Sequence, residues 1–480
     1  MTSLLYTEKA LLENLEMYIA KLEDKVDSLK ILIDKLKADY LESLQDPEDY
    51  LSNPLNYFGL LRHMKSDWTN IDNYVLQPVG EEYSRAMTTY HMEMPDSIDL
   101  EEAIEGMHYL QTMYNLDVEG LSKGILNGRQ YKARLSSLDM YTIGVQLFHE
   151  KHYFDTILWL ASSILSYEDD SFNEIMDFDR GTILELYAEA YMQQNRAKEA
   201  LIVLRTILRL GPSTPELLKR KDEVEFLAQS RDTEPYKYVK PQPTLYALGC
   251  SGKLAERPSK LYCTYNRNTT AFSRLAPMKM ELISLDPYMV LYHEALTDNE
   301  IIQLKEMAIP HLERAKVFDG KTNREIIAKD RTSQIFLVPE VGEINVRLHY
   351  RVIDMTGLSM VNSEVFQILN YGIGGQNAPH FDSFNVSMTH EHVNGIGDRI
   401  ASVLFYMSDV EEGGATVFPR IQKAIRPQKA TALFWYNLNN EIETDPNTLH
   451  GGCPVLIGSK WVITKWIRSN AQMFIRRCRR

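Results

Sequence analysis

Apolar residues recur every seven positions through the first forty residues of the chain. They form one complete row and most of a second, with Lys25 as an interruption, which is an a/d heptad pattern. The pattern predicts one long helix that ends at Asp46-Pro47, because proline disfavours helical backbone in the residue before it. Such a helix either dimerises as a coiled coil or packs within a bundle, and further helix is expected over 51–116. The two rows are Leu15, Leu22, Leu29 and Leu36, and Leu11, Tyr18 and Leu32.

Between about residues 136 and 230, small and large apolar residues alternate as in tetratricopeptide helix pairs, whose repeat is roughly 34 residues. Two such pairs can form a concave groove for an extended peptide, and a plain α-hairpin domain without a ligand is the alternative. The second, clearer unit carries the pattern at Ala188, Tyr191, Ala200, Leu204, Ile207 and Pro212, and the first at Gly144, Leu147, Tyr153 and Leu160.

The segment 231–281 is rich in proline and lacks hydrophobic periodicity, which is typical of a linker or extended arm. Short apolar runs separated by Gly and Pro turns follow it, and they predict a sandwich or barrel, best fitted by a double-sheet jelly roll. The expected strands are 289–292, 333–338, 365–371, 400–406, 430–435 and 460–467, with helices at 298–308 and 341–356.

These patterns predict a multidomain α + β chain. Its expected parts are a helical N-terminal region at 1–130, a tetratricopeptide-like domain at 136–230, a linker at 231–281 and a β domain at 282–480.

Composition narrows the possible functions. The 480 residues include 52 basic and 66 acidic side chains, a net charge of −14, which disfavours sequence-independent nucleic-acid binding. No apolar run of about 20 residues predicts a membrane span. The four cysteines are either free thiols or two disulfides, and the first residues lack the features of a signal peptide.

The C-terminal domain contains candidate metal ligands. His380 and Asp382 are two residues apart at the end of an expected strand, so both side chains point to one face. His450 is the best candidate for a third ligand. Two histidines and a carboxylate form the facial triad of non-haem Fe(II) oxygenases. The tripeptide alone is a weak signal, because a surface or core histidine explains it as well.

Lys460, ten residues after His450, lies in an apolar strand. Its ammonium group can pair with the distal carboxylate of a dicarboxylic cosubstrate. Tyr371 and Ser402 lie on strands that can line the same pocket, and each is also a plausible packed strand residue.

Residues 365–470 resemble the catalytic domain of the collagen prolyl 4-hydroxylase α subunit, a family of Fe(II)/2-oxoglutarate dioxygenases. The N-terminal helix resembles the family's dimerisation segment, and the middle resembles its tetratricopeptide-type peptide-binding domain. The matching segments are NYGIGGQ (370–376), PHFD (379–382), RIA (399–401), LFYMSDV (404–410), GGATVFP (413–419), FWYNL (434–438) and CPVLIG (453–458).

The resemblance implies that the chain hydroxylates peptidyl proline at C4, with O2 and 2-oxoglutarate consumed and succinate and CO2 formed. It assigns Fe(II) to His380, Asp382 and His450, and the distal 2-oxoglutarate carboxylate to Lys460, Tyr371 and Ser402. Ascorbate would restore oxidised iron. Trp466 matches a position near the target proline, and Arg468 one near the cosubstrate carboxylate.

The resemblance also implies a setting for the enzyme: an α2β2 tetramer with protein disulfide isomerase as β subunit, in the lumen of the endoplasmic reticulum. It pairs Cys250 with Cys263 and Cys453 with Cys478, and both disulfides imply an oxidising compartment. The missing signal peptide is then explained by a truncated or processed N-terminus. Of two glycosylation sequons, Asn268 is favoured over Asn385, because a glycan at Asn385 would crowd the active site.

The sequence departs from the family pattern in three places. Arginine stands at 468, where the family has histidine, and Asn377-Ala378 replace a Tyr-Glu pair. Leu186 and Glu189 occupy two tyrosine positions of the peptide groove. We therefore expect altered cosubstrate handling and substrate preference. The alternatives are a catalytically weak paralogue that serves as a binding or assembly subunit, and a hydroxylase for another residue or protein.

Overall fold

The computed structural model describes residues 2–211, 214–230, 242–255, 261–319, 324–327, 332–384 and 393–475. The chain divides into two compact units, 1–100 and 101–480, and each is described by itself. Within the described residues, no helix is both long enough and apolar enough to cross a bilayer.

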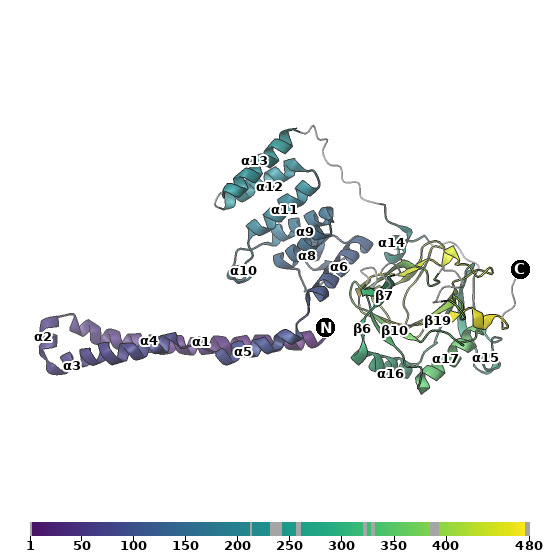
Figure 1. The fold of residues 1–480 in the computed structure, drawn as a ribbon, viewed down its shortest axis with the longest axis horizontal. Coiled ribbons are helices and arrows are strands. Elements are labelled where there is room, and N and C mark those ends of the chain that lie inside the picture. The colour runs from purple at the N-terminus through teal and green to yellow at the C-terminus, as the bar shows by residue number, and fades with distance from the viewer. Residues whose placement is uncertain are drawn as a thin grey trace. The chain divides into compact units, whose positions relative to one another are not determined.

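The first unit is a long helical hairpin (Figure 1). Its first arm is α1 (Thr2–Ser43), which confirms the predicted long helix, and Asp46 caps the next helix through Asp49 N. The return arm consists of α2 (Pro47–Ser52), α3 (Pro54–Arg62), a π-helical turn (His63–Asp67), α4 (Trp68–Leu76), α5 (Glu81–Tyr90) and a 3₁₀ turn (His91–Glu93).

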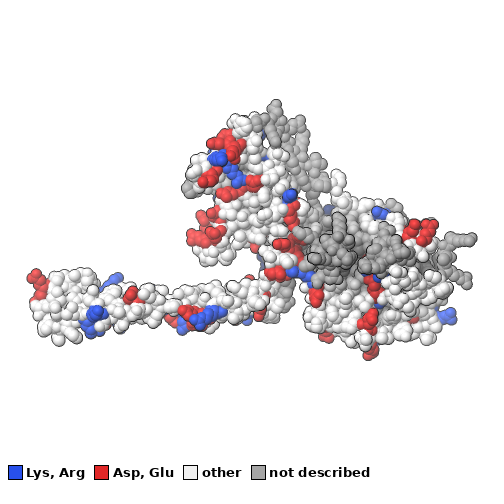
Figure 2. Space-filling model, in the orientation of Figure 1, with Lys and Arg blue, Asp and Glu red and all other residues white. Residues whose placement is uncertain are grey.

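Lys25, which interrupts the heptad, has a role in this hairpin. Its ammonium group donates to the backbone oxygens of Val75 and Gln77, at 2.8 and 2.7 Å, where α4 ends and leaves carbonyls without helical partners. Leu15, in contrast, remains 40% exposed. Acidic and basic side chains lie next to each other along this unit (Figure 2), as in the ion pair between Arg85 and Glu81. Pairing of α1 with a second chain stays a prediction.

The second unit begins with helices that pack in antiparallel pairs. Close helix crossings need small residues, and Ala188 and Ala200 are both fully buried where α11 meets α12. Gly144 lies against Leu160, with no room for a Cβ atom. These helices are α6 (Ser97–Tyr114), α7 (Val118–Ser122), α8 (Ser137–His149), α9 (Tyr153–Ser166), α10 (Ser171–Ile175), α11 (Arg180–Gln193), α12 (Ala197–Leu210) and α13 (Pro215–Ser230), with a small hairpin of β1 (Ile125–Leu126) and β2 (Arg129–Gln130).

Two antiparallel sheets form the C-terminal part of this unit. The larger has nine strands, in the order β3-β4-β5-β16-β12-β19-β10-β9-β6, and the smaller has four, β11-β17-β14-β15; β13-β18 and β7-β8 are separate pairs. The strands of the larger sheet are β3 (Cys263–Asn266), β4 (Met278–Leu285), β5 (Tyr288–Tyr292), β6 (Glu313–Arg314), β9 (Gln334–Leu337), β10 (Gln367–Tyr371), β12 (Arg399–Tyr406), β16 (Ala432–Tyr436) and β19 (Lys460–Arg468). The others are β7 (Lys316–Asp319), β8 (Arg324–Ile327), β11 (Asn377–His380), β13 (Glu412–Gly413), β14 (Thr416–Phe418), β15 (Lys423–Ile425), β17 (His450–Gly452) and β18 (Val455–Ile457).

The nine-stranded sheet has two different faces, because successive side chains of a strand alternate. On β12, Val403 and Phe405 belong to a core that includes residues of α16 (Asp298–Ala308) and α17 (Glu343–Thr356). Leu404 and Tyr406 belong to a second core, shared with Phe418 of the smaller sheet. We call these the helix face and the site face.

The β domain begins earlier than the predicted boundary at 282. That residue lies inside β4, and β3 and β4 already belong to the nine-stranded sheet. Within the predicted linker, α14 (Leu245–Cys250) packs on β14, and α15 (Ala271–Leu275) is also helical. The sequence lacks a periodic signal here because these elements are short and proline-flanked. Residues 231–241 and 256–260 lie outside the described residues.

Candidate metal and cosubstrate site

The smaller sheet brings two histidines together. β11 and β17 are antiparallel, and their register places His380 opposite His450, with ring centroids 4.5 Å apart. Asp382 follows β11 by two residues. Its Oδ1 lies 3.4 Å from His380 Nε2, and its Oδ2 lies 3.8 Å from His450 Nε2. One ligand atom from each residue therefore lies within 4.8 Å of the other two.

Backbone carbonyls orient both rings. His380 Nδ1 lies 2.8 Å from Ala378 O, and His450 Nδ1 lies 2.9 Å from Thr448 O. Nδ1 donates in each case, so Nε2 keeps its lone pair and faces the carboxylate. Metal-binding histidines are typically oriented in this way. The ring of His450 is further held by Phe418, stacked at 5.2 Å, and by Trp435, edge-on at 4.9 Å.

A buried hydrogen-bond chain positions the carboxylate. Asn437 Nδ2 donates to Ser402 Oγ at 2.9 Å, and Ser402 donates to Asp382 Oδ2 at 2.5 Å. The structure thus differs from the prediction for Ser402: its hydroxyl supports the metal ligand and is not among the groups that line the cavity with Lys460. Asn437 was not predicted. A buried amide at the end of an apolar strand is the one sequence signal that points to it.

The electrostatics suit a cation. Burial favours the neutral form of Asp382, yet His450, His380 and Ser402 together hold the pKa of that carboxyl well below its usual range. Burial lowers the pKa of His450 to about 4, so its imidazole is neutral near pH 7. A carboxylate and two imidazoles whose Nε2 atoms face it are the donor set of a facial Fe(II) site, and these residues fit that ion.

Comparisons with known proteins agree with this site. The family model "Prolyl 4-Hydroxylase alpha-subunit, N-terminal region" matches residues 1–128, and the model of the 2OG-Fe(II) oxygenase superfamily matches 366–468. Prolyl 4-hydroxylase subunit alpha-1 of Rattus norvegicus is 33% identical over 511 aligned positions, covering 100% of this chain and 94% of the relative. Subunit alpha-2 of Gallus gallus is also 33% identical, with 100% and 94% covered.

The chain belongs to the prolyl 4-hydroxylase alpha-subunit family. A solved structure of a viral collagen prolyl hydroxylase from Paramecium bursaria Chlorella virus-1, in complex with 2OG, also matches. It is 24% identical, has a TM-score of 0.32, and covers 38% of this chain and 96% of that one.

In this family member, Lys460 lies beside the triad. A cavity on the site face is lined by Lys460, Tyr371 and Thr416 together with the three triad residues. The ammonium of Lys460 lies 5.5 Å from the ring centroid of Tyr371 and 5.9 Å from that of Tyr406. Burial lowers the pKa of Lys460 to about 7. No ion pair of Lys460 with a carboxylate is found among the described residues, so the cavity holds a buried cation that an anionic ligand would complement.

Thr416 was missed by the sequence analysis. It is buried, it lines the cavity, and it accepts a 2.7 Å hydrogen bond from Tyr406, so its own hydrogen is available for another acceptor. Its place within the segment GGATVFP is the sequence signal that could have singled it out.

Trp466 is among the residues that line this cavity, and its predicted place near the target proline stays a prediction. Its indole Nε1 is buried and has no hydrogen-bond partner within the described parts of the chain. Arg399 stacks on the ring, with its guanidinium 3.9 Å from the centroid.

Arg468 is placed differently from its prediction. Its guanidinium is held by Glu364 Oε1 at 2.7 Å and by Gly397 O at 3.0 Å, and it is not among the cavity-lining residues. Glu364 is also bound in bidentate fashion by Arg399. Glu364 is thus shared by Arg399 and Arg468, and the three side chains form a charged cluster beside Trp466.

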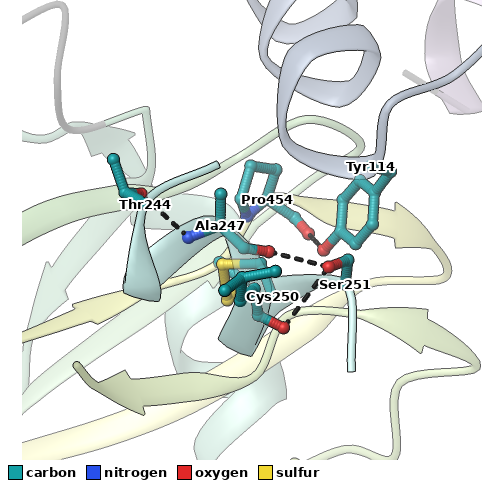
Figure 3. The surroundings of a disulfide bond; sticks show 8 residues. Tyr114, Thr244, Ala247, Cys250, Ser251 and Pro454 are labelled. Carbon is teal, nitrogen blue, oxygen red and sulfur yellow. Dashed lines mark hydrogen bonds between the residues drawn. A yellow bond between two sulfur atoms is a disulfide. The ribbon is translucent and has the colours of Figure 1, made fainter. Parts of the chain in front are cut away.

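The predicted disulfides are wrong. Cys250 pairs with Cys453, with a Cα–Cα distance of 5.5 Å, and Cys263 is free and exposed on β3. Packing of α14 on β14 brings Cys250 to the strand turn after His450, although 203 residues separate the two cysteines. Figure 3 shows this junction, where Tyr114 donates to Pro454 O at 2.6 Å. Cys478 lies outside the described residues.

Of the two sequons, only Asn268 can be described. It is exposed, and Thr270 of the same sequon caps α15 and donates to Asp354 at 2.6 Å. Glycosylation of Asn268 stays a prediction. Asn385 lies outside the described residues.

Proposed function

We propose that this chain hydroxylates peptidyl proline to 4-hydroxyproline, coupled to oxidative decarboxylation of 2-oxoglutarate to succinate and CO2. One observation carries the proposal: His380, Asp382 and His450 converge next to a buried, unpaired Lys460, in a chain 33% identical over its full length to prolyl 4-hydroxylase subunits alpha. Fe(II), when bound, supplies the activation of O2.

The side chains of this chain would bind and orient the metal and the cosubstrate. His380, Asp382 and His450 would hold the metal, and Ser402 fixes the carboxylate. Lys460 would form a charge-assisted pair with the distal carboxylate of 2-oxoglutarate, with the hydroxyls of Tyr371 and Thr416 as further donors. The apolar walls exclude water from this pair.

Trp466 is the candidate for substrate contact. It lines the cavity near the triad, and its buried N–H would donate to a carbonyl oxygen of the target peptide. The Arg399–Glu364–Arg468 cluster fixes the ring from behind, which makes Arg399 and Arg468 positioning residues.

Proline-rich or collagen-like segments are the proposed substrates, bound on the helices α8 to α13 as a tetratricopeptide-type groove. Tyr187 and Tyr191 support this proposal. Their rings lie 4.7 Å apart, their hydroxyls are 2.8 Å apart, and Arg196 stacks on Tyr191. Polyproline segments dock on such aromatic faces.

The wider setting follows the family resemblance. We propose a double-stranded β-helix oxygenase domain, a coiled-coil dimer through α1, protein disulfide isomerase as β subunit of an α2β2 tetramer, ascorbate as reductant and the lumen of the endoplasmic reticulum as compartment. The Cys250–Cys453 disulfide supports an oxidising compartment.

A direct assay tests the activity. The full chain is co-expressed with protein disulfide isomerase, supplied with Fe(II), 2-oxoglutarate and ascorbate, and given Pro-Pro-Gly repeat peptides. Mass spectrometry is expected to find one oxygen gained on proline, with the product lost in His380→Ala and kept in a control variant of an exposed histidine, His311→Ala. Tyr187→Ala is expected to raise KM for the peptide and leave kcat unchanged.

Two failures would have different meanings. Absence of both product and uncoupled succinate from the intact protein would reject the enzyme and favour a binding subunit. Succinate without hydroxyproline would reject proline-rich peptides as substrate and keep the oxygenase chemistry.

A further inference from the structure

A second group of metal-ligating side chains lies in the helical part of the second unit. One ligand atom each from His108, His152 and Asp155 lies within 4.8 Å of the other two. His108 is on α6, His152 is the residue before α9, and Asp155 is in the first turn of α9. None of the three belongs to the cavity around the His380 triad.

The distances suit a tetrahedral ion. His108 Nε2 lies 3.1 Å from Asp155 Oδ2, and the ring centroids of His108 and His152 are 4.6 Å apart. Zinc bonds to imidazole nitrogen and carboxylate oxygen at about 2.0–2.2 Å, so two ligand atoms on one tetrahedral ion lie roughly 3.3 Å apart. His108 and Asp155 are close to this spacing, and the exposed His152 offers a ring nitrogen within 4.8 Å of both ligand atoms.

Buried neighbours orient the carboxylate. Gln111 Nε2 donates to Asp155 Oδ1 at 3.2 Å and leaves Oδ2 for the histidines. Gln111 is itself fixed by Trp159 Nε1, which donates to its Oε1 at 2.7 Å, and both of these side chains are buried. A ligand carboxylate held by such a hydrogen-bonded support is typical of built metal sites.

The backbone that carries His152 is also fixed. Lys151 has a positive φ of 67°, and the amide of His152 donates to Leu147 O at 2.9 Å, as at the end of a Schellman motif. The turn between α8 and α9 therefore presents the His152 side chain from a defined position, while its exposure leaves a path for an ion to enter.

We propose that His108, His152 and Asp155 form a second divalent-metal site, of the zinc class, that fastens α6 to α9. Two imidazoles and one carboxylate leave a fourth position for water. Helix α6 also contacts the oxygenase domain, because its Tyr114 donates to Pro454 O beside the Cys250–Cys453 disulfide (Figure 3). An ion at this site would stiffen the connection between the helical hairpins and the oxygenase domain.

Metal stoichiometry tests the proposal without reference to activity. The full chain is loaded with Zn²⁺, dialysed against metal-free buffer and analysed by mass spectrometry of its metal content. We expect two ions per wild-type chain, one in His450→Ala, one in His152→Ala and none in the double variant. His149→Ala is the matched control, because His149 is an exposed histidine only three residues away, and it is expected to keep two ions.

Co²⁺ provides a second measurement. In the His450→Ala background, Co²⁺ is expected to give the intense visible bands of a four-coordinate ion, and these bands are expected to vanish on adding Asp155→Asn. That substitution keeps the oxygen that accepts from Gln111 and removes the charge, so the fold of the helices is expected to survive, as circular dichroism would show. Two results would overturn the proposal. One is that His450→Ala and its double variant with His152→Ala bind the same amount of Zn²⁺, and the other is that His450→Ala binds no Zn²⁺. Either result would leave only a hydrogen bond between His108 and Asp155.

Discussion

Lys460 and Lys465 lie five residues apart on β19 and point to opposite faces of the nine-stranded sheet. Both are buried, and burial lowers the pKa of both, to about 7 and about 8. Lys465 is satisfied within the protein: it donates to the backbone oxygen of Glu364 and lies 4.5 Å from the ring centroid of Phe366. Lys460, in contrast, lies near the rings of Tyr371 and Tyr406 and lines the cavity.

The difference between the two lysines extends to the two faces. The helix face packs apolar residues such as Phe405 against α16 and α17, and its buried Lys465 donates to a backbone oxygen. The site face carries Ser402, Lys460 and Trp466. Ser402 donates to the metal-ligand candidate Asp382, Lys460 lines the cavity, and the Nε1 atom of Trp466 has no hydrogen-bond partner among the described residues. A β-strand can therefore separate stability from chemistry by alternation alone, and substitutions on the two faces are expected to fail in different ways.

The largest effect on turnover is expected for substitution of a metal ligand. His450→Ala removes one of three ligands, and the loss of several kcal/mol of transition-state stabilisation corresponds to roughly a thousand-fold or greater fall in turnover. Turnover by the comparison variant His349→Ala, in α17 behind the helix face, is expected to change less than about threefold. Equal losses in the two variants would remove the distinction between the faces.

Phe405→Ala probes the helix face. Truncation of this fully buried ring is expected to lower the free energy of unfolding by about 3–5 kcal/mol, because the surrounding core cannot close the cavity. Denaturant unfolding would measure this loss, and turnover per folded molecule is expected to stay close to that of the wild type. A loss of turnover at full occupancy of the native state would contradict the division between the faces.

Ser402→Ala tests the support of the metal ligand. Without the hydroxyl, Asp382 loses its neutral donor and Asn437 loses its acceptor, and metal affinity is expected to fall about 10- to 100-fold. Titration with Fe(II) under anaerobic conditions would measure it. Ser408→Ala removes a hydroxyl that donates to Ser459 O and is expected to leave the metal affinity unchanged. If Ser402 bound the cosubstrate as first predicted, affinity for 2-oxoglutarate would fall and metal affinity would not.

The pH dependence of cosubstrate binding follows from Lys460. The ammonium is needed to pair with a carboxylate, and in the free protein its pKa is about 7. Affinity for 2-oxoglutarate is therefore expected to be full below pH 7 and to fall by up to about tenfold per pH unit above it. Calorimetric titration across this range would show the slope, and an affinity that stays constant well above pH 7 would count against Lys460 as the partner.

Much of the site could be predicted from local patterns. The two-residue spacing of His380 and Asp382 correctly predicted that they lie together, although Asp382 follows β11 and is not part of the strand, and the helix at Asp298–Ala308 has the expected bounds. Ser402 was assigned to the cosubstrate instead of to Asp382, because the contact between Ser402 and Asp382 arises only from the packing of two sheets. Arg468 was misjudged for a similar reason, since nothing in the sequence pairs it with Glu364.

The disulfide shows the same limit more sharply. Cys250 lies much closer in sequence to Cys263 than to Cys453. Packing of α14 on the smaller sheet nevertheless brings Cys250 to Cys453, and these two form the disulfide. Such contacts between distant segments depend on the whole fold, which periodicity and spacing do not determine.

The most direct test compares Lys460→Met with Lys465→Met in one measurement, the affinity for 2-oxoglutarate by calorimetry. Loss of a charge-assisted hydrogen bond in a buried site costs about 1.5–3 kcal/mol, so Lys460→Met is expected to bind roughly ten- to a hundred-fold more weakly. Lys465→Met is expected to bind as the wild type does. Equal weakening in both variants, or weakening in Lys465→Met alone, would contradict the assignment of the cosubstrate to the site face.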